Sequence, residues 1–586
     1  MAKIFIRETK ENTFMQHSDP YDVIICGGGL AGLSLARQLT LKLDDLSILV
    51  LERLERPLPD SAFKVGESTL EQGAFYFSGI LGLEDYLESE HLEKLGLRYF
   101  FGDPQGDFAQ RPEFGVRTWL PAKSYQMDRG KLETHLRECV IGAGVHLEEG
   151  VFVTEIDINE SGGLHTVSYR NAEKALHQVQ GKWVIDAMGR RRFLQSKFDL
   201  KKECETPCNA AWFRVKGELS VDSFVPESEK AWHDKVIQDR WYSTNHLMGS
   251  GYWVWLIPLS PGNTSIGIVA LDEIHRFDQY NTYEKALSWL QKHEPVLAAH
   301  LEGYPLLDFK VLRNYSYSSH QVFSADRWCC IGEAGVFADP YYSIGSNVLA
   351  YGNGIAAKMI DLDYTGQLTE LYADYMNLFY LSLNDSLTET VHWSYPFHNH
   401  GVIMALKTIW DYFMGWSITD PRFYHDVYLE PALNRELSLL LHPIFSAHFR
   451  LMTLFKDWSG LSSRMNFDFI DYIEDLPTLT HLFLLNLPPK NAIFDVIVDH
   501  LREGVERMEE FAQVIFFLAV EDVVPEKLAL FGEKRWVNIE AIGLDSNRWQ
   551  EDGLFEPRTE PRDLSRMDGE IRKLFSFEPQ KSPATA

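Results

Sequence analysis

The chain has 586 residues, of which 45% are hydrophobic, and its 84 acidic and 56 basic side chains give a formal net charge of −28. This length accommodates roughly three to four domain-sized units and a large buried core. Because so acidic a protein repels polyanions, we expect neither a nucleic acid nor an anionic membrane surface as its partner.

The sequence predicts a protein without a secretory signal or a membrane span. The first twenty residues are polar and lack an apolar signal core. No stretch of about 18 uncharged apolar residues occurs, and the nearest candidate, residues 436–455, carries Glu436, Pro443 and Arg450. We expect that segment to be a buried or groove-lining helix and the protein to be cytoplasmic.

The six cysteines fit a reducing compartment. Cys26, Cys329 and Cys330 lie in apolar runs that predict buried strands. Cys204 and Cys208 are four residues apart, but no matching Cys or His cluster has the spacing of a zinc site. We therefore expect reduced thiols and no bound metal.

The stretch YDVIICGGGLAGLSLARQL, residues 21–39, predicts a nucleotide site. A short apolar strand leads into Gly27, Gly29 and Gly32, and a helix follows. Such glycines allow a tight turn and a close backbone approach to a pyrophosphate at the helix N-terminus. A second strand ends at Glu52, twenty residues after Gly32, where a carboxylate can accept hydrogen bonds from a ribose.

Three later segments indicate that the dinucleotide is FAD. Residues 124–147 read as a short strand feeding a helix that begins near Arg129, and residues 182–194 as a strand ending in Asp186. Residues 327–360 read as a buried strand, a loop with Pro340, and a helix. A nicotinamide dehydrogenase has no need of this distant third segment, and no other strand–glycine–helix unit appears, so we expect no separate NAD(P)H domain.

The stretch GYWVWLIPLSPG, residues 251–262, places two tryptophans on one face of a predicted strand. Trp253 and Trp255 are two residues apart, and residues two apart share a face. Pro258 follows, and we expect it to end regular hydrogen bonding. Ordinary packing in the core of a sheet explains the same pattern.

These segments together resemble the flavin-dependent halogenases, the tryptophan-halogenase-like branch of the FAD monooxygenases, over about residues 21–360. The resemblance is closer to the phenol and pyrrole types than to the free-tryptophan type. The matching motifs are W-x-W-x-I-P at Trp253, Trp255, Ile257 and Pro258; G-x-G-x-x-G at Gly27, Gly29 and Gly32; G-E-S-T at Gly66, Glu67, Ser68 and Thr69; F-x-x-P-x-x-S-x-G at Phe337, Pro340, Ser343 and Gly345; and K-x-G-x-x-F at Lys94, Gly96 and Tyr99.

The resemblance implies an α/β fold. It comprises an FAD-binding Rossmann-like domain of the GR2 flavoprotein type, an inserted mixed β-sheet substrate domain, and a mainly helical C-terminal region. We expect an N-terminal tail at residues 1–20, a discontinuous FAD-binding domain at 21–365 with the sheet domain inserted at about 205–320, and the helical region at 366–586.

The resemblance also implies an activity. FADH2 from a separate flavin reductase, oxygen, and chloride or bromide would yield hypohalous acid at the flavin. That species would reach Lys94 and then an electron-rich aromatic substrate. Forming a haloamine needs a neutral amine, which desolvation favours, whereas hydrogen bonding to hypohalous acid uses the ammonium form; the sequence leaves both open.

Three groups of site residues follow from the resemblance. The backbone after Pro340 opens a helix and would cradle a halide, although Ser343 or Ser346 as an ordinary N-cap explains the same residues. The expected halide site is Ser343, Gly345 and Ser346. The expected barrier between flavin and substrate is Trp253, Trp255, Ile257, Pro258, Phe337 and Pro340. The expected FAD contacts are Gly27, Gly29, Gly32, Glu52, Arg53, Ser68, Arg129, Asp186, Glu333, Asp339 and Gly345.

The sequence departs from the family pattern at several positions. Glu333 replaces an Asp, Ile344 replaces a Thr, and Ala187 after Asp186 replaces the Gly of aromatic hydroxylases. Tyr342 stands where the free-tryptophan halogenases carry a Glu, and a Tyr does not ionise readily near neutral pH. We therefore expect a phenol, a pyrrole or a carrier-linked aromatic as substrate, and an FAD-dependent monooxygenase or oxidoreductase without halogenating activity is the alternative.

A substrate tethered to an acidic carrier protein would need a basic landing surface. One cluster of cations in the sequence offers it, although such clusters commonly just face water. Its members are Arg190, Arg191, Arg192, Lys197, Lys201 and Lys202.

Overall fold

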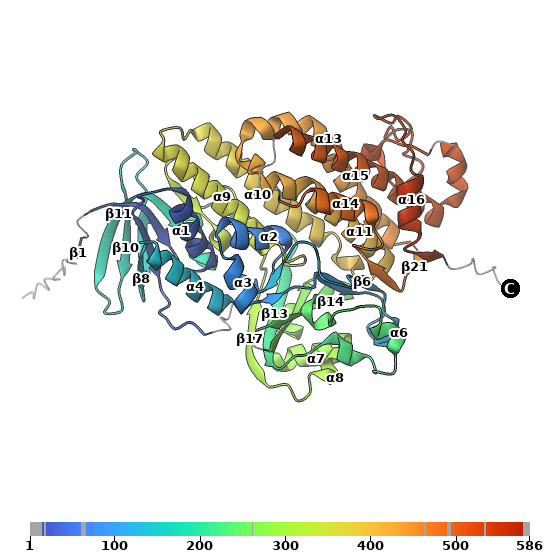
Figure 1. Ribbon diagram of the computed structural model, residues 1–586, viewed down its shortest axis with the longest axis horizontal. Helices are drawn as coiled ribbons and strands as arrows, with labels where there is room; N and C mark the ends of the chain where they lie inside the picture. The colour runs from blue at the N-terminus through green and yellow to red at the C-terminus, as the bar shows by residue number, and fades with distance from the viewer. Residues whose placement is uncertain are drawn as a thin grey trace, which may run out of the picture.

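The structure, a computed structural model, describes residues 15–16, 19–59, 66–260, 262–461, 465–488, 494–532 and 535–577. Figure 1 shows one sheet flanked by α1 (Leu30–Lys42) and α4 (Arg129–Gly142), a second sheet that carries α7 (Tyr283–His293) and α8 (Pro295–His300), and a helical region formed by the C-terminal part of the chain. This architecture confirms the predicted α/β fold class.

The first sheet has the order β19-β20-β11-β2-β3-β8, and every neighbouring pair after β20 is parallel. Its central strands are apolar runs that are buried almost completely, as expected of a parallel sheet covered on both faces. The bounds are β2 Tyr21–Cys26, β3 Ile48–Glu52, β8 His146–Glu149, β11 Leu176–Asp186, β19 Phe323–Ser324 and β20 Trp328–Cys330, with β9 Phe152–Asp157, β10 His165–Arg170 and β1 Met15–Gln16 attached beside β11.

The register of this sheet brings three distant segments to one edge. Cys26 of β2 lies opposite Asp186 of β11, which lies opposite Cys330 of β20. The glycine turn, the turn after Asp186, and the loop after Cys330 therefore leave the sheet side by side at its carboxyl edge. In open α/β sheets this edge is where a dinucleotide binds.

The second sheet has eight strands in the order β17-β13-β16-β15-β14-β5-β6-β22. The interval 205–320 omits three of them, because β5 pairs with β14 and β22 pairs with β6. These three strands are four residues long or shorter, so they show no periodicity of their own. The bounds are β5 Leu97–Phe100, β6 Glu113–Gly115, β13 Cys208–Lys216, β14 Thr244–Gly249, β15 Tyr252–Leu259, β16 Asn263–Leu271, β17 Leu306–Leu312 and β22 Phe469–Asp471.

Strand β15 is buried on both faces, and its two faces belong to different cores. Trp253 and Trp255 pack into the large core shared with the first sheet and the helical region. Tyr252 and Val254, which alternate with them, pack into a smaller core beneath α7 and α8. The two indoles therefore face the rest of the molecule, as their spacing predicts.

The C-terminal region is a set of packed helices, drawn in yellow to red in Figure 1. One helix in the described part of the chain, α13, is long and apolar enough to cross a membrane, but 44% of its most apolar window is buried and it packs against α15. One such helix is weak evidence for a span. The main helices are α9 Gly345–Tyr364, α10 Glu370–His392, α11 Gly401–Met414, α13 Pro431–Ser459, α14 Pro477–Leu485, α15 Phe494–Val523 and α16 Ser565–Arg572.

Candidate active site

The turn between β2 and α1 has the shape of a diphosphate cradle. Gly27 has a φ of 114°, and a Cβ there would overlap the carbonyl of Ala187. A Cβ on Gly32 would overlap the carbonyl of Gly27. Helix α1 starts after Gly29 without a side-chain cap, so its first N–H groups are open to an anion. The cradle therefore fits a dinucleotide such as FAD.

Glu52 lies at the end of β3, next to this cradle. Its carboxylate is buried and accepts hydrogen bonds from Gly28 N at 2.6 Å and Leu54 N at 2.8 Å. Each carboxylate oxygen retains a lone pair for a ribose hydroxyl. Arg53, the next residue, is exposed.

Asp186 and Glu333 lie at the same edge of the sheet. Asp186 is fully buried and accepts from Met188 N at 3.1 Å and Leu194 N at 2.9 Å, so it holds the turn after β11. Burial raises the pKa of Asp186 to about 6. Glu333 is partly buried, and its neighbour Gly332 approaches α1 so closely that a Cβ would lie 2.7 Å from that of Ala31.

The G-E-S-T loop rests on the start of α4. Met127 N donates to Glu67 O at 2.6 Å, and a Cβ on Gly66 would lie 2.8 Å from Arg129 Nη1. Arg129 also donates to Glu133 at 2.9 Å. Ser68 is buried and its Oγ lies 2.9 Å from the hydroxyl of Thr244 in β14.

Lys94 is buried, with 1% of its surface exposed. It lies between β4 (Leu92–Glu93) and β5, and its Nζ donates to Thr69 O at 2.7 Å. Desolvation lowers the pKa of Lys94 to about 7, against an opposing effect of Glu71. A large fraction of this amine is therefore neutral near physiological pH.

Glu71 is the residue near Lys94 that the sequence analysis missed. It is buried at the first position of α2 (Glu71–Phe75), and burial raises the pKa of its carboxyl group. Its place two residues after the G-E-S-T motif was the available signal. Burial therefore shifts the pKa of each of these two groups toward its neutral form.

Helix α2 connects Lys94 with the start of α9. Gly73 N donates to Asn347 Oδ1 at 3.0 Å, and a Cβ on Gly73 would overlap Ser346 Oγ. Thr69, which accepts from Lys94, lies two residues before the first residue of α2. The amine and the start of α9 therefore belong to one local assembly.

The turn before α9 leaves the first turn of that helix without a side-chain cap. Ser343 has a φ of 62° and its N–H donates to Pro340 O at 2.8 Å. Ile344 is the N-cap residue, so neither expected serine serves as the cap. Ser346 Oγ is buried and has no hydrogen-bond partner among the described residues, and Gly345 is exposed.

The paired indoles are fixed at both N–H groups. Trp253 and Trp255 are 2% and 5% exposed, and their ring centroids are 5.7 Å apart. Trp253 Nε1 donates to the hydroxyl of Tyr395 at 3.0 Å, and Trp255 Nε1 donates to Ser265 Oγ at 3.2 Å. They form a rigid wall next to Tyr341, whose ring centroid is 5.5 Å from that of Trp253.

The expectation that Pro258 ends regular hydrogen bonding is wrong. Strand β15 continues through Ile257 and Pro258 to Leu259, and Pro258 pairs with Thr264 of β16. The pairing with β14 ends at Leu256, so β15 has only one neighbour at the proline. A missing N–H is tolerated where a strand has an open side.

Phe337 and Asp339 lie in the loop between β20 and α9. Phe337 pairs its backbone with that of Tyr317. Asp339, an expected FAD contact, is fully buried and engaged within the protein, where Tyr315 and Tyr395 donate to its Oδ2 at 2.6 Å and 2.8 Å. The hydrogen-bond donors to the Asp339 carboxylate are therefore side chains of the protein itself.

Cys208, Asp339 and His392 are buried, and their potential ligand atoms all lie within 4.8 Å of one another. The sequence predicted no metal site, and the spacing within this cluster would admit one. However, Asp339 Oδ2 already accepts two phenolic hydroxyls, so a metal ion bound at that oxygen would displace one of them. His392 Nε2 lies 3.2 Å from the same oxygen, and we assign the cluster to an ion pair.

Tyr342 leads to a buried charged network that the sequence analysis missed. Its hydroxyl donates to Asp411 Oδ2 at 2.6 Å. Lys407, which is fully buried, lies 2.6 Å from that oxygen and 3.2 Å from the tyrosine hydroxyl. Lys407 and Asp411 are four residues apart in the apolar helix α11, which was the available signal.

The cluster of cations is partly engaged within the protein, although four of its six members are exposed. Arg192 is buried and pairs with Glu203 at 2.9 Å. Lys197 and Lys202 pair with acidic side chains, and Arg190 and Arg191 donate to backbone carbonyls. Arg191, Lys197, Lys201 and Lys202 remain exposed, so the cluster offers a partly neutralised basic surface.

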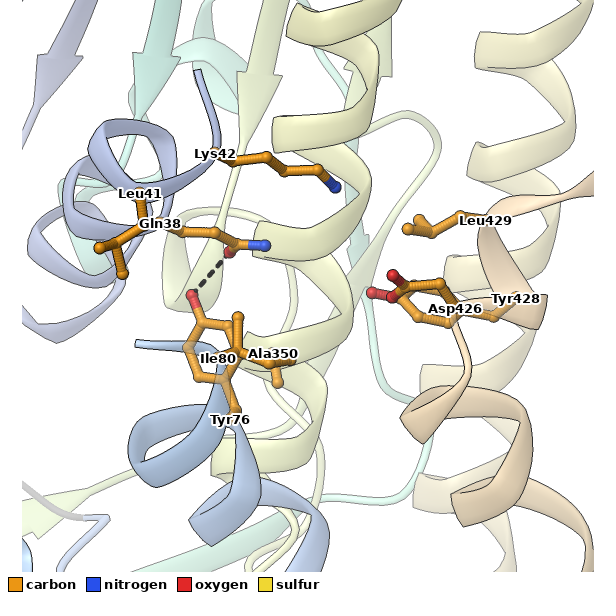
Figure 2. Close-up of a pocket in the computed structure, with 9 residues that line it drawn as sticks. All are labelled: Gln38, Leu41, Lys42, Tyr76, Ile80, Ala350, Asp426, Tyr428 and Leu429. Carbon is orange, nitrogen blue, oxygen red and sulfur yellow. Dashed lines mark hydrogen bonds between the residues drawn. The ribbon is translucent and has the colours of Figure 1, made fainter. Parts of the chain in front are cut away.

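Two surface pockets in the described part of the chain lie away from these residues. One, of about 260 Å³, lies between α1, α9 and the loop that carries Asp426 and Tyr428 (Figure 2). Gln38 and Lys42 line it at the end of α1 opposite the glycine turn. The other, of about 460 Å³, lies between α15 and residues 561–568.

No protein-family model matches the chain. Among curated proteins it is similar to the flavin-dependent halogenase chlA of Dictyostelium discoideum, with 32% identity over 362 residues. That match covers 56% of this chain and 58% of the relative, so less than two thirds of the relative is spanned. The chain is also similar to a 1H-pyrrole-2-carbonyl-(peptidyl-carrier protein) brominase of Pseudoalteromonas luteoviolacea, with 26% identity over 58% of this chain and 77% of the relative.

Among solved structures, halogenase PltM in complex with phloroglucinol and FAD matches with a TM-score of 0.60 and 16% identity over 84% of this chain and 96% of that chain. The flavin-dependent brominase Bmp2 matches with a TM-score of 0.52 and 23% identity over 65% of this chain and 89% of that chain. These likenesses show a shared fold.

Proposed function

We propose that the chain is a flavin-dependent halogenase, like the curated relatives that it resembles, and that it halogenates an electron-rich aromatic carbon. The net reaction replaces one aryl C–H bond by a C–X bond. It consumes FADH2, O2, one halide ion and one proton, and releases FAD and two molecules of water. FADH2, supplied by a separate reductase, provides the two electrons of this reaction when it is bound.

The residues at the carboxyl edge of the first sheet would hold the flavin. The turn from Gly27 to Gly32 presents open N–H groups to the diphosphate, and Glu52 presents its carboxylate to a ribose. Asp186 keeps the adjoining turn in place through its two backbone hydrogen bonds. Ser68 and Arg129, also proposed to contact the flavin, come from a loop and a helix that contact each other.

The buried amine of Lys94 is the observation that carries the proposal. Its low exposure and depressed pKa give it a neutral form, which is the nucleophilic form of an amine. Lys94 would take up or orient hypohalous acid, and its hydrogen bond to Thr69 O holds the amine in place. A lysine on the surface would have none of these properties.

The start of α9 supports a halide site close to this amine. The first N–H groups of α9 have no side-chain cap, and Ser346 Oγ is buried without a partner among the described residues. A halide accepts hydrogen bonds from such donors and is favoured by the helix dipole. We propose Ser343, Gly345 and Ser346 as its contacts.

Phenols and pyrroles fit the proposed site better than free tryptophan does. Tyr342 donates to Asp411 beside Lys407, so no free carboxylate is available at this position. Activated rings need less help from a base. Arg191, Lys197, Lys201 and Lys202 are exposed and only partly paired with acidic side chains, so we propose carrier-linked rings as substrates beside free small molecules.

The test is a turnover assay with the purified protein, FAD, a flavin reductase with NADH, oxygen, and chloride or bromide. Free phenols, pyrroles and indoles, and carrier-bound pyrrole, are offered, and the halogen isotope pattern is read by mass spectrometry. We expect halogenated phenol or pyrrole from the wild type and none from Lys94→Ala. Lys123→Ala is the matched control, because that lysine is 45% exposed and pairs with Glu88 at the surface.

Other outcomes would contradict parts of the proposal. Hydroxylated product without halogen would favour a monooxygenase of the same fold. Tight flavin binding without any product would indicate a non-catalytic flavoprotein. A Lys94→Ala variant that still halogenates would remove the role of the amine and leave the reaction class intact.

A further inference from the structure

A buried chain of hydrogen bonds connects Asp339 with the indole wall. Trp253 Nε1 donates to the hydroxyl of Tyr395 at 3.0 Å, and that hydroxyl donates to Asp339 Oδ2 at 2.8 Å. Tyr315 donates to the same carboxylate oxygen at 2.6 Å, and His392 Nε2 lies 3.2 Å from it. All these side chains are at least nine-tenths buried.

We propose that Asp339 is a positioning residue that fixes the Trp253 indole through Tyr395, and that it holds no ligand itself. This inference rests on the proposed halogenase function for its catalytic consequence. The structural part, that Asp339 orders the indole, stands on the contacts alone.

The carboxylate sets the direction of the whole chain. A carboxylate only accepts hydrogen bonds, so the 2.8 Å contact has the Tyr395 O–H pointing toward Asp339; the Tyr315 hydroxyl, 3.1 Å away, is the other acceptor within reach. This orientation leaves a lone pair of the Tyr395 oxygen for the indole N–H of Trp253, which only donates. Without the charge on Asp339, the hydroxyl could rotate and the indole would lose a defined acceptor.

His392 supplies the balancing charge. Burial acts to lower the pKa of His392, but hydrogen bonding to Asp339 and to nearby thiols raises it to about 12. The pair is therefore an imidazolium and a carboxylate, and two phenolic donors complete the shell around the anion. A buried ion pair of this kind is retained only when its remaining lone pairs are satisfied.

The same carboxylate also holds the turn before α9. Asp339 Oδ1 accepts from Tyr341 N at 3.0 Å, and Ser343 N closes the turn on Pro340 O at 2.8 Å. One side chain therefore ties the tryptophan wall to the segment proposed to bind halide. A change at Asp339 would disturb both together.

The first test follows the Trp253 indole directly. The protein with bound FAD is labelled with ¹⁵N at the indole nitrogens, and the Trp253 signal is assigned with Trp253→Phe. In the wild type we expect slow hydrogen exchange at this N–H. In Asp339→Asn and Tyr395→Phe we expect exchange at Trp253 to be at least about tenfold faster, while most of the other 14 indoles keep their rates.

Glu294→Gln is the matched control. Glu294, like Asp339, is a buried carboxylate. It forms an ion pair with Arg111 at 2.7 Å and accepts a hydrogen bond from the hydroxyl of Tyr252, on β15, at 3.0 Å. It lies on the opposite face of that strand, so its loss should leave the Trp253 exchange rate unchanged. Unchanged exchange in Asp339→Asn, or an equal acceleration at all indoles, would overturn the positioning role.

The second test measures how efficiently FADH2 consumption is coupled to the formation of halogenated product. In Asp339→Asn we expect the yield of halogenated product per FADH2 consumed to fall at least about tenfold, with FAD affinity within about twofold of the wild type. The loss should not add to that of Trp253→Phe in the double variant. If Asp339→Asn does not fold, Asp339→Glu, which displaces the carboxylate by one methylene, takes its place in both tests, because Tyr395→Phe tests only the direct contact with Trp253. If the wild type makes no halogenated product, the proposed function fails and the exchange experiment still tests the positioning.

Discussion

Trp255 lies directly against Gly267 of the neighbouring strand, so closely that a Cβ on Gly267 would overlap the indole ring. Gly267→Ala should therefore displace the wall residue and lower the free energy of unfolding by about 1–3 kcal/mol, the usual cost of overpacking a core. Urea unfolding measures this loss. Gly142→Ala, at an open position of α4, should be neutral or slightly stabilising, and a Gly267→Ala protein as stable as the wild type would contradict the packing.

Lys94 should make stability rise with pH. Between pH 7 and 10.5 the folded protein holds Lys94 mainly as the neutral amine, whereas the unfolded chain keeps the proton. The unfolded state then binds more protons, so each pH unit in this window adds about 1.4 kcal/mol to the free energy of unfolding. Lys94→Met should lose this slope, and Lys123→Met should keep it; urea unfolding at pH 7, 8 and 9 compares them. Equal slopes in all three proteins would mean that the amine is charged in the folded state.

Glu52 should contribute to flavin affinity. Its carboxylate shapes the glycine turn through Gly28 and would accept from a ribose hydroxyl. Hydrogen bonds to a charged group contribute about 1.5–3 kcal/mol, so Glu52→Gln should raise the FAD dissociation constant about 10- to 150-fold. Fluorescence titration with FAD measures it, with Glu55→Gln, at an exposed position, as the control. An unchanged constant would place the adenosine elsewhere.

Ser346 should affect the use of halide. Removing a hydroxyl that donates to the charged ion costs about 1.5–3 kcal/mol, so Ser346→Ala should raise the KM for bromide or chloride about 10- to 150-fold at nearly constant kcat. Ser288→Ala, on the exposed face of α7, is the comparison. If the two variants have the same halide KM, the start of α9 is not the halide site.

The buried pair of Lys407 and Asp411 should respond asymmetrically to mutation. Lys407→Met leaves a carboxylate buried without its cation and should cost about 3–5 kcal/mol. Lys407→Met combined with Asp411→Leu removes both charges and should recover most of that loss. Thermal unfolding of the single and double variants distinguishes the two cases, and additive losses would argue against direct pairing.

The cofactor edge of the fold could be predicted because its signals are local. The glycine turn, the strand before it and Glu52 lie within about thirty residues, and strong strand and helix patterns fix their order. The burial of Lys94 and the two indoles also follows the motif pattern. An exposed Lys94 would have removed the basis for the proposal, and the structure buries it.

The polar network around the wall could not be predicted, because its members are far apart in the chain. The motif predicts Asp339 as an FAD contact, but it does not predict its partners Tyr395 and His392, which come from the helical region more than fifty residues later. Glu71 gave only a weak signal beside the G-E-S-T motif. Pairings of this kind depend on tertiary packing, which periodicity does not report.

Strand β22 covers an edge of the second sheet, although it lies in the C-terminal part of the chain. It pairs with β6, and its last residue, Asp471, accepts the N–H of Arg117 at 2.9 Å. A protein truncated before residue 465 would bare the hydrogen-bonding edge of β6, and unprotected edges promote self-association. The C-terminal helical region thus contributes a strand to the sheet that carries the tryptophan wall. We therefore do not expect the sheet and the helical region to fold as independent units.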